Sequence, residues 1–255
     1  MDPARANALQ AALGQSQLFE TGDILPPFFH QLYFWTPEPP ARLGRDGHPA
    51  VGQGVIPDMG LPRRMWAAGR LAFHAELKAG LQSERITECE KSVIKEGRSG
   101  PLGFVSLRHE IRQAGRLCVT EWQDLVYRAD PSTTAPPLAP PTARVDEEEA
   151  RLIRFDPTLL FRYSALTFNG HRIHYDVTYA KETEGYDGLV VHGPLLAHLM
   201  MQMATVSLGP LGGFSFRATA PLMDFETAIL CRSGHDLWVR GPDGRQCMIA
   251  AAQPL

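Results

Sequence analysis

The amino-acid sequence predicts an α+β protein in which two antiparallel sheets form two halves, and only the C-terminal sheet wraps a long helix. Three observations lead to this expectation. A proline-rich stretch, residues 130–142, divides the chain into nearly equal parts. Both parts contain alternating apolar and polar segments that flank glycine-containing turns. Only the second part contains a long and largely apolar helical segment, residues 195–208.

The composition is that of an ordinary globular protein and excludes several function classes. A net charge of −3 over 255 residues gives no basic footprint, so no nucleic-acid partner is expected. No apolar run reaches the roughly 18 residues that span a bilayer, and the N-terminus has no apolar signal segment. We therefore expect no membrane partner and a cytoplasmic location. The four cysteines lack CxxC spacing and predict free thiols: Cys89, Cys118, Cys231 and Cys247.

The N-terminal half, residues 1–129, begins with short helical segments and a long loop. Residues 4–13 predict a short helix, and the aromatic-rich residues 26–35 predict a short buried one. Residues 36–62 are rich in proline and glycine and are too long for a simple connection. They predict a loop that covers a binding site.

Strands dominate the remainder of this half, and a linker of residues 130–148 follows. Alternation predicts four strands, at residues 70–74, 85–94, 102–112 and 117–127. The last two form a hairpin. The half contains no long apolar helix, so it reads as a degenerate copy of the second.

The C-terminal half, residues 149–255, is organised around the long helix. Gly193 and Pro194 favour a helix start, and Gly209 favours its end. A helix that is apolar over most of its circumference belongs inside a domain, although this one carries a narrow polar stripe of His198, Gln202 and Thr205. Four strands are expected behind it, at residues 214–220, 227–232, 237–240 and 246–251, the last two joined by a hairpin turn at 241–244.

One stretch of this half carries chemistry. Asn169, His171 and His174 lie within six residues, which is too polar for a core strand and too irregular for an amphipathic helix. His192 and Gly193 follow at the start of the long helix. Because histidine titrates near neutral pH, this group can move protons. A metal site is the alternative, but the spacing of these histidines is not a standard zinc pattern and no metal is expected.

The order Tyr163-x-x-Leu166-Thr167, then Ile173-His174, resembles the signature of the (R)-specific enoyl-CoA hydratases, the MaoC-like hot-dog family. In that family a histidine-glycine pair also opens the central helix. The departures lie at the centre of the motif, where four residues replace the family's glycine, catalytic aspartate, asparagine and proline: Phe168, Asn169, His171 and Arg172.

Those changes, together with residues 61–66, 162–174 and 185–194, resemble the branch that hydrates mesaconyl-CoA (3-methylfumaryl-CoA) or itaconyl-CoA to citramalyl-CoA. The resemblance implies a double hot-dog fold whose degenerate first half leaves its missing helix volume to an acyl group. It implies an acyl-CoA substrate and no separate cofactor, since coenzyme A is part of the substrate. The sequence leaves open whether the chain is a monomer or a homodimer formed through sheet edges.

The resemblance also assigns catalytic roles. His174 is expected to act as base and later as acid, and Asn169, which cannot take a proton, to orient the water or the histidine. The backbone N–H of Gly193 at the helix start is expected to stabilise the enolate oxygen.

Substrate contacts are expected from several cationic and aromatic side chains. Arg172 lies two residues before His174, so on an extended segment both would point to one face, and Arg172 would hold the substrate carboxylate. Arg63 and Arg64 could reach the CoA phosphates, or they could form a solvated surface pair. The remaining candidates are Tyr163, His171, His192 and Arg162.

Three other functions stay open at this point. They are an (R)-specific hydratase of plain enoyl-CoA, a hot-dog thioesterase, and an acyl-CoA-binding domain in which Asn169 marks lost catalysis. The thioesterase is disfavoured because the long helix carries no acidic residue placed as its nucleophile or base.

Overall fold

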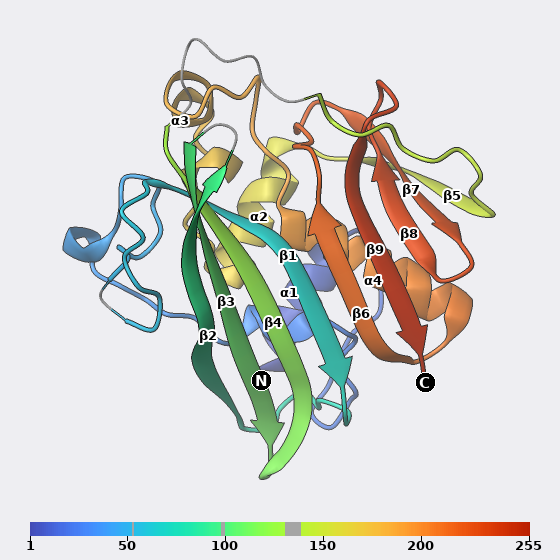
Figure 1. Ribbon diagram of the computed structural model, residues 1–255. Helices are drawn as coiled ribbons and strands as arrows, with labels where there is room; N and C mark the ends of the chain where they lie inside the picture. The colour runs from blue at the N-terminus through green and yellow to red at the C-terminus, as the bar shows by residue number, and fades with distance from the viewer. Residues whose placement is uncertain (53, 98–99, 131–138) are drawn as a thin grey trace.

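The computed structural model describes residues 1–52, 54–97, 100–130 and 139–255, and its strands form one continuous sheet (Figure 1). The strand order is β2-β3-β4-β1-β6-β9-β8-β7-β5, and every neighbouring pair is antiparallel. The bounds are β1 Arg63–Phe73, β2 Ser83–Gly97, β3 Gly100–Gln113, β4 Arg116–Arg128, β5 Glu149–Arg154, β6 Leu211–Ala218, β7 Thr227–Ser233, β8 Asp236–Arg240 and β9 Gln246–Pro254.

The sheet contains the same strand arrangement twice. The first half runs β1-β4-β3-β2 from the centre outward, and the second runs β6-β9-β8-β7 in the matching order. The two halves that we expected from the sequence are therefore both present. They do not form separate sheets, because β1 pairs with β6 over residues 68–72 and joins them into one.

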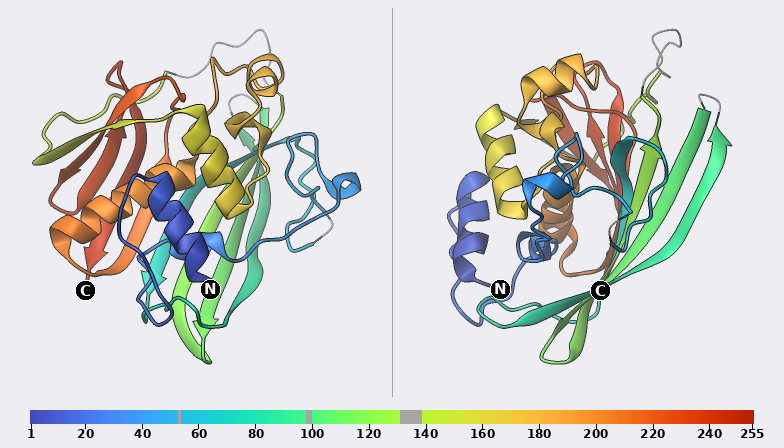
Figure 2. Two further views of the ribbon diagram at one scale, coloured as in Figure 1. Left: turned by 180° about the vertical axis from the view of Figure 1, so that it is seen from behind. Right: turned by 90° about the vertical axis from the view of Figure 1, so that its left-hand side faces the viewer.

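The helices cover one side of this sheet. Figure 2 shows α1, α2 and α4 together on that side. The helix bounds are α1 Pro3–Ala12, α2 Pro157–Thr167, α3 Val177–Glu182 and α4 Gly193–Leu208, with 3₁₀ turns η1 Phe29–Leu32, η2 Pro40–Arg42 and η3 Arg172–His174.

The long helix α4 forms as predicted and lies at the centre of the second half. Pro194 stands in its first turn, and the N–H of Gly209 closes it on the Thr205 carbonyl oxygen at 3.1 Å. It packs against β6, β7, β8 and β9. Two side chains of its polar stripe have hydrogen-bond partners within the protein, because Gln202 lies 3.1 Å from the His198 ring and 3.0 Å from Gln15. No helix in the described ranges is long and apolar enough to cross a membrane.

The first half has no helix like α4 among its described residues, and an aromatic segment packs against the sheet instead. Phe28, Phe29 and Leu32 are buried here. The Phe28 ring centroid lies 6.2 Å from both Trp66 on β1 and Phe216 on β6. Part of the volume that we expected to be free is therefore filled by η1 and the residues before it.

Three elements were not predicted from the sequence: α2, α3 and β5. Both helices begin at an aspartate whose side chain accepts a backbone hydrogen bond, from Leu159 to Asp156 at 2.8 Å and from Tyr179 to Asp176 at 3.0 Å. The proline-rich residues 131–138 of the predicted linker lie outside the described ranges.

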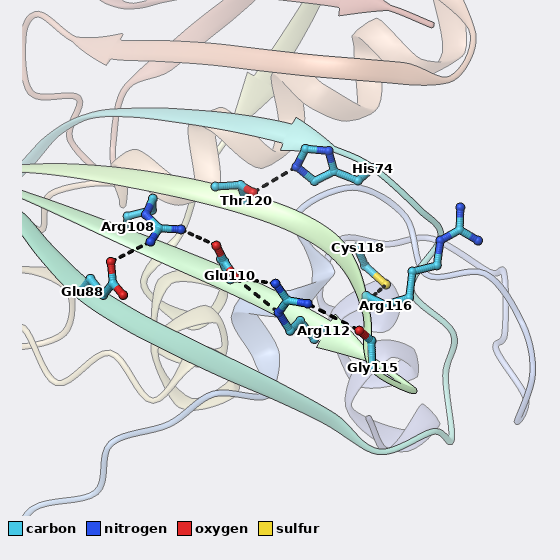
Figure 3. Close-up of polar contacts among 9 residues, drawn as sticks. All are labelled: His74, Glu88, Arg108, Glu110, Arg112, Gly115, Arg116, Cys118 and Thr120. Carbon is cyan, nitrogen blue, oxygen red and sulfur yellow. Dashed lines mark hydrogen bonds and ion pairs between the residues drawn. The ribbon is translucent and has the colours of Figure 1, made fainter.

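The outer face of the first half is charged. On β2 and β3, Arg108 pairs with Glu88 at 2.6 Å and with Glu110, and Arg112 pairs with Glu110 at 2.8 Å (Figure 3). Exposed pairs of this kind stabilise a fold only slightly. They do mark this face as solvated, so the binding site has to be sought on the helical side.

Candidate active site

Four histidine rings form a row at the edge of the helical side. The His174 ring stacks on His192 with centroids 3.7 Å apart and planes 20° from parallel. His171 meets His174 edge-on at 5.4 Å, and His48 lies 4.8 Å from His171 on its far side. The row joins the loop of residues 36–62, the η3 turn and the start of α4. We call these four residues the histidine row.

His174 is held in one tautomer. Its Nδ1 lies 2.7 Å from the carbonyl oxygen of Val190, which can only accept a hydrogen bond. Nδ1 therefore carries the proton in the neutral ring, and Nε2 carries the lone pair. Burial lowers the pKa of His174 to about 4, with the Val190 bond opposing the shift. The ring is consequently neutral at pH 7 and can accept a proton at Nε2.

His192 is completely buried beside it, at the N-cap of α4. Its Nε2 lies 2.8 Å from the Ser164 hydroxyl, and the Tyr163 ring packs edge-on at 5.0 Å. Burial, followed by the nearby His174, holds the pKa of His192 well below its usual range. In the described part of the chain, neither Nδ1 of His192 nor the hydroxyl of Tyr163 has a hydrogen-bond partner, although both are buried. Unsatisfied buried polar atoms mark a place where a water or a ligand can bind.

The turn before η3 fixes the side chain of Asn169. Its Oδ1 accepts the backbone N–H of His171 at 3.0 Å, and its own N–H donates to the Ser164 carbonyl oxygen at 2.8 Å. The remaining polar group of Asn169 is the side-chain NH₂, which can only donate. The side-chain NH₂ is therefore the group of Asn169 that is left to donate to a partner.

The start of α4 offers a free donor. The His192 side chain makes no capping bond, and the N–H groups of Leu195 and Leu196 both turn back to the His192 carbonyl oxygen. No hydrogen bond in the described ranges uses the N–H of Gly193. The first N–H groups of a helix carry partial positive charge and bind anions.

The loop of residues 36–62 lies on this site, as its composition led us to expect. The carbonyl oxygen of Asp46 accepts the backbone N–H of Arg172 at 2.8 Å. The loop therefore brings His48 onto His171 and forms one wall of the histidine row. His48 was not predicted, because the loop has no periodic pattern that would single out one residue.

Arg172 does not point toward His174, and the expectation of a shared face was wrong. Residues 172–174 form a 3₁₀ turn with three residues per turn, so positions two apart diverge. The Arg172 guanidinium stacks over Tyr179 at 4.2 Å, donates twice to Asp176 at 2.7 and 3.1 Å, and once to the Arg45 carbonyl oxygen at 3.2 Å. Three of its five N–H donors are therefore engaged within the protein.

The other three arginines lie in different surroundings. Arg162 is on the exposed face of α2. Arg63 is buried and forms an ion pair with Glu184, so its guanidinium has a partner inside the protein. Arg64 stands at the start of β1 on the opposite side of that strand from Arg63, and its charge lowers the pKa of His171, after the larger effects of burial and of His174.

Most of the residues expected at this site lie close together. The structure brings together Tyr163, Asn169, His171, His174, His192 and Gly193, with Arg64 nearby. It does not bring Arg162, Arg63 or the Arg172 guanidinium into the row. Within the described ranges no three His, Cys, Asp or Glu side chains converge as metal ligands do. The arrangement combines a neutral base, an amide donor and a helix-start N–H, which is the set that water addition to an enoyl thioester needs.

Comparison with known proteins gives a consistent result. Residues 28–224 match the family described as hydroxyacyl-thioester dehydratase type 2. A mesaconyl-C(4)-CoA hydratase from Chloroflexus aurantiacus is 43% identical over 256 residues, which cover 98% of this chain and 91% of the relative.

Two solved structures agree with the fold. A MaoC-like dehydratase from Phytophthora capsici superposes with a TM-score of 0.68 at 12% identity, over 100% of this chain and 92% of its own. A conserved Mycobacterium tuberculosis protein described as having a double hotdog fold gives a TM-score of 0.61 at 15% identity, over 99% and 91% of the two chains. At these identities the likeness bears on the fold alone, and it confirms the predicted double hot-dog fold.

Proposed function

From the premise that this chain belongs to the hydroxyacyl-thioester dehydratase type 2 family, we propose that it hydrates mesaconyl-C(4)-CoA reversibly to citramalyl-CoA. The similarity to the hydratase of Chloroflexus aurantiacus supports this substrate class. The observation that carries the reaction type is the bond from His174 to the Val190 carbonyl oxygen, which leaves an unprotonated Nε2 in a neutral, buried ring.

The proposed chemistry uses one proton and one water. His174 Nε2 removes a proton from the water as its oxygen bonds to the β-carbon. The electron pair of the double bond moves toward the thioester carbonyl, and the Gly193 N–H stabilises the resulting enolate oxygen. His174 then returns the proton to the α-carbon, so the histidine is neutral at the start and at the end.

Neighbouring side chains position the reactants in this proposal. The NH₂ group of Asn169 donates to the water oxygen, which directs the water's proton toward His174. His171, His192 and Tyr163 line the pocket of the acyl group. Because burial lowers the pKa of His171 to about 2, this ring is neutral and does not repel a proton arriving on His174.

The test is an absorbance assay on purified protein. Loss of the enoyl-thioester band on adding the protein to mesaconyl-C(4)-CoA supports the proposal. Loss with crotonyl-CoA but not with mesaconyl-C(4)-CoA would favour a general enoyl-CoA hydratase. Loss with itaconyl-CoA would require an additional shift of its double bond, and release of free CoA would indicate a thioesterase. Binding without any spectral change would indicate a non-catalytic acyl-CoA-binding protein.

We further propose that the reaction needs no metal or separate cofactor and takes place in the cytoplasm. The four cysteines are free, as a reducing compartment requires. Dialysis against a strong chelator should leave turnover unchanged, and recovery by zinc of activity lost to the chelator would contradict this. A homodimer through the outer strands β2 and β5 stays a prediction that a solution mass measurement can decide.

A further inference from the structure

Arg64 and Tyr127 lie together on the helical side of the first half. They are directly paired across β1 and β4, and directly paired residues on adjacent strands point to the same face. On this face Tyr127 packs with Met59, Val105 and Leu125, so it is the face that the loop of residues 36–62 covers. The same loop contributes His48 to the histidine row.

Neither side chain is paired with a carboxylate among the described residues. The Tyr127 side chain is 1% exposed, and its hydroxyl has no hydrogen-bond partner in the described ranges. No carboxylate of the described chain lies within 4 Å of the Arg64 guanidinium, and its charge opposes the rise in pKa that burial causes at Tyr127 and at Asp46. A buried hydroxyl without a partner costs folding free energy, so its retention points to an acceptor that arrives from outside.

Two other arginines near the site differ from Arg64 because each has an ion-pair partner. Arg63, one residue earlier, is paired with Glu184, and Arg172 is paired with Asp176. Arg64 thus stands beside the histidine row as a partly buried cation that makes no ion pair within 4 Å in the described chain, although its charge acts on Asp46. Its charge contributes to lowering the pKa of both His48 and His171, after the larger effect of burial, which places it near those rings.

The acceptor that suits this pair is an anion, either a carboxylate or a phosphate. A guanidinium fork matches a carboxylate in a bidentate geometry, and a phenol can add a third donor. In mesaconyl-C(4)-CoA the free carboxylate sits on the β-carbon, the atom that receives the hydroxyl. It must therefore lie close to the base, whereas the CoA phosphates are separated from the reacting carbons by the whole pantetheine arm. A cation beside the histidine row fits the acyl end of the substrate.

We propose that the Arg64 guanidinium and the Tyr127 hydroxyl bind the free carboxylate of the acyl group and thereby select dicarboxylic enoyl-CoA substrates. This inference rests on the proposed function and names the substrate-recognising residues of the same site. It replaces the role that the sequence suggested for Arg172. Holding the carboxylate fixes the β-carbon against the water, so the contact acts on kcat as well as on KM.

The kinetic experiment compares two substrates that differ in the substituents of the β-carbon. The β-carbon carries a methyl group and a hydrogen in crotonyl-CoA, and a carboxylate and a methyl group in mesaconyl-C(4)-CoA. Arg64→Gln should lower kcat/KM for mesaconyl-C(4)-CoA by about 30- to 1,000-fold, the range for losing one partner of a buried charge pair, and Tyr127→Phe by about 10- to 100-fold. Both variants should change kcat/KM for crotonyl-CoA less than about threefold. Arg70→Gln is the matched control, because Arg70 lies on the same strand but is exposed over Trp122.

A binding experiment separates this proposal from the proposed function. Methylsuccinyl-CoA with its carboxylate on the β-carbon, and butyryl-CoA, are saturated and cannot react. Wild type should bind the first more tightly, and Arg64→Gln should abolish the difference while the far-UV circular dichroism stays unchanged. If wild type shows this Arg64-dependent preference but no turnover, the hydratase function fails and the carboxylate site stands. Equal losses on both substrates and both analogues would overturn the carboxylate site and leave the hydratase function intact.

Discussion

Gly47 and Gly170 each occupy the space that a side chain on the other would need. A Cβ on Gly47 would lie 2.1 Å from the carbonyl oxygen of Gly170, and a Cβ on Gly170 would lie 2.4 Å from the carbonyl oxygen of Gly47. Both values are far below contact distance and involve backbone atoms that cannot swing away. This contact holds the loop of residues 36–62 on the turn that carries Asn169 and His171.

Gly170→Ala should therefore detach the loop from the turn. Gly170 does not have a positive φ, so alanine is acceptable there and only the contact with Gly47 is lost. We expect kcat/KM to fall at least tenfold while the far-UV circular dichroism is retained. Gly60→Ala is the control in the same loop, because Gly60 has φ +64° and open space around it. That variant pays about 1–2 kcal/mol of backbone strain and should keep its activity. Similar activity in the two variants would mean that docking of the loop is unimportant.

His174→Asn should lose most turnover while keeping the local structure. An asparagine NH₂ can stand in for Nδ1–H and donate to the Val190 carbonyl oxygen, but it offers no basic nitrogen at the Nε2 position. Removing a general acid–base group typically lowers the rate by about 10²–10⁴-fold. His174→Ala should lose the same activity and should also be less stable, because it cannot form the hydrogen bond to the Val190 carbonyl oxygen. Turnover is measured in the absorbance assay, and wild-type kcat in His174→Asn would show that another group moves the proton.

Activity should persist well below the pH at which an ordinary histidine becomes charged. Burial lowers the pKa of His174 to about 4, and the neutral ring is the active form. The same proton moves between water and carbon in both directions, so both need the neutral ring. The rates of hydration and of dehydration should therefore fall at the same acidic pH. We expect kcat/KM to stay level from pH 7.5 to about 5.5 and to fall toward pH 4, measured in brief assays. A midpoint near 6.5 in the free enzyme would contradict the low pKa.

The free energy of unfolding should begin to fall at a higher pH than the activity does. Burial also lowers the pKa of His171 to about 2 and that of His198 to about 3, whereas in the unfolded chain these groups titrate near 6.5. The unfolded state then binds more protons below pH 6.5, so the free energy of unfolding falls as pH falls. Together with His174 these groups contribute about 3 kcal/mol to the loss between pH 6 and pH 5, and His48 and His192, whose pKa burial also lowers, add to it.

Urea unfolding at several pH values measures this loss. His198→Gln is a matched variant, because glutamine can keep the contact with Gln202 without titrating. Its stability should change less with pH, by about 1.4 kcal/mol per pH unit below pH 6. A wild-type stability that stays constant from pH 7 to pH 5 would mean that these rings are charged in the folded protein.

Patterns that are local in the sequence predicted the local structure. The apolar run before Gly209 predicted α4, and the turns at residues 113–115 and 241–244 predicted their hairpins. The start of α2 carried a signal that was overlooked, since Asp156-Pro157 is a favourable N-cap and first-turn pair. The pairing of Arg172 with Asp176 was also readable as an i, i+4 pair, but only once the segment was known to be helical and not extended.

Contacts between distant segments could not be predicted in this way. His48 reaches the histidine row only because Gly47 docks on Gly170, and no periodicity in the loop signals that docking. Arg63 and Arg64 are adjacent and chemically identical in the sequence. They have different partners because successive side chains on β1 point to opposite faces. Arg63 points toward Glu184 and Arg64 toward Tyr127.

The buried pair of Arg63 and Glu184 gives a direct test of that difference. Their side chains are 5% and 6% exposed, and the hydroxyl of Tyr179 also donates to Glu184 at 3.0 Å. Removing one partner leaves an uncompensated buried charge, so Glu184→Leu should cost about 3–5 kcal/mol of unfolding free energy. The double variant Arg63→Met, Glu184→Leu should recover most of this loss, because two apolar side chains can replace a buried ion pair at little cost. Urea unfolding of the two single variants and the double one measures the coupling.

The KM for CoA esters should stay within about threefold of wild type in the double variant, since the Arg63 guanidinium faces Glu184 and not the solvent. A KM that rises tenfold or more in Arg63→Met, with the free energy of unfolding unchanged, would indicate that Arg63 binds the CoA phosphates.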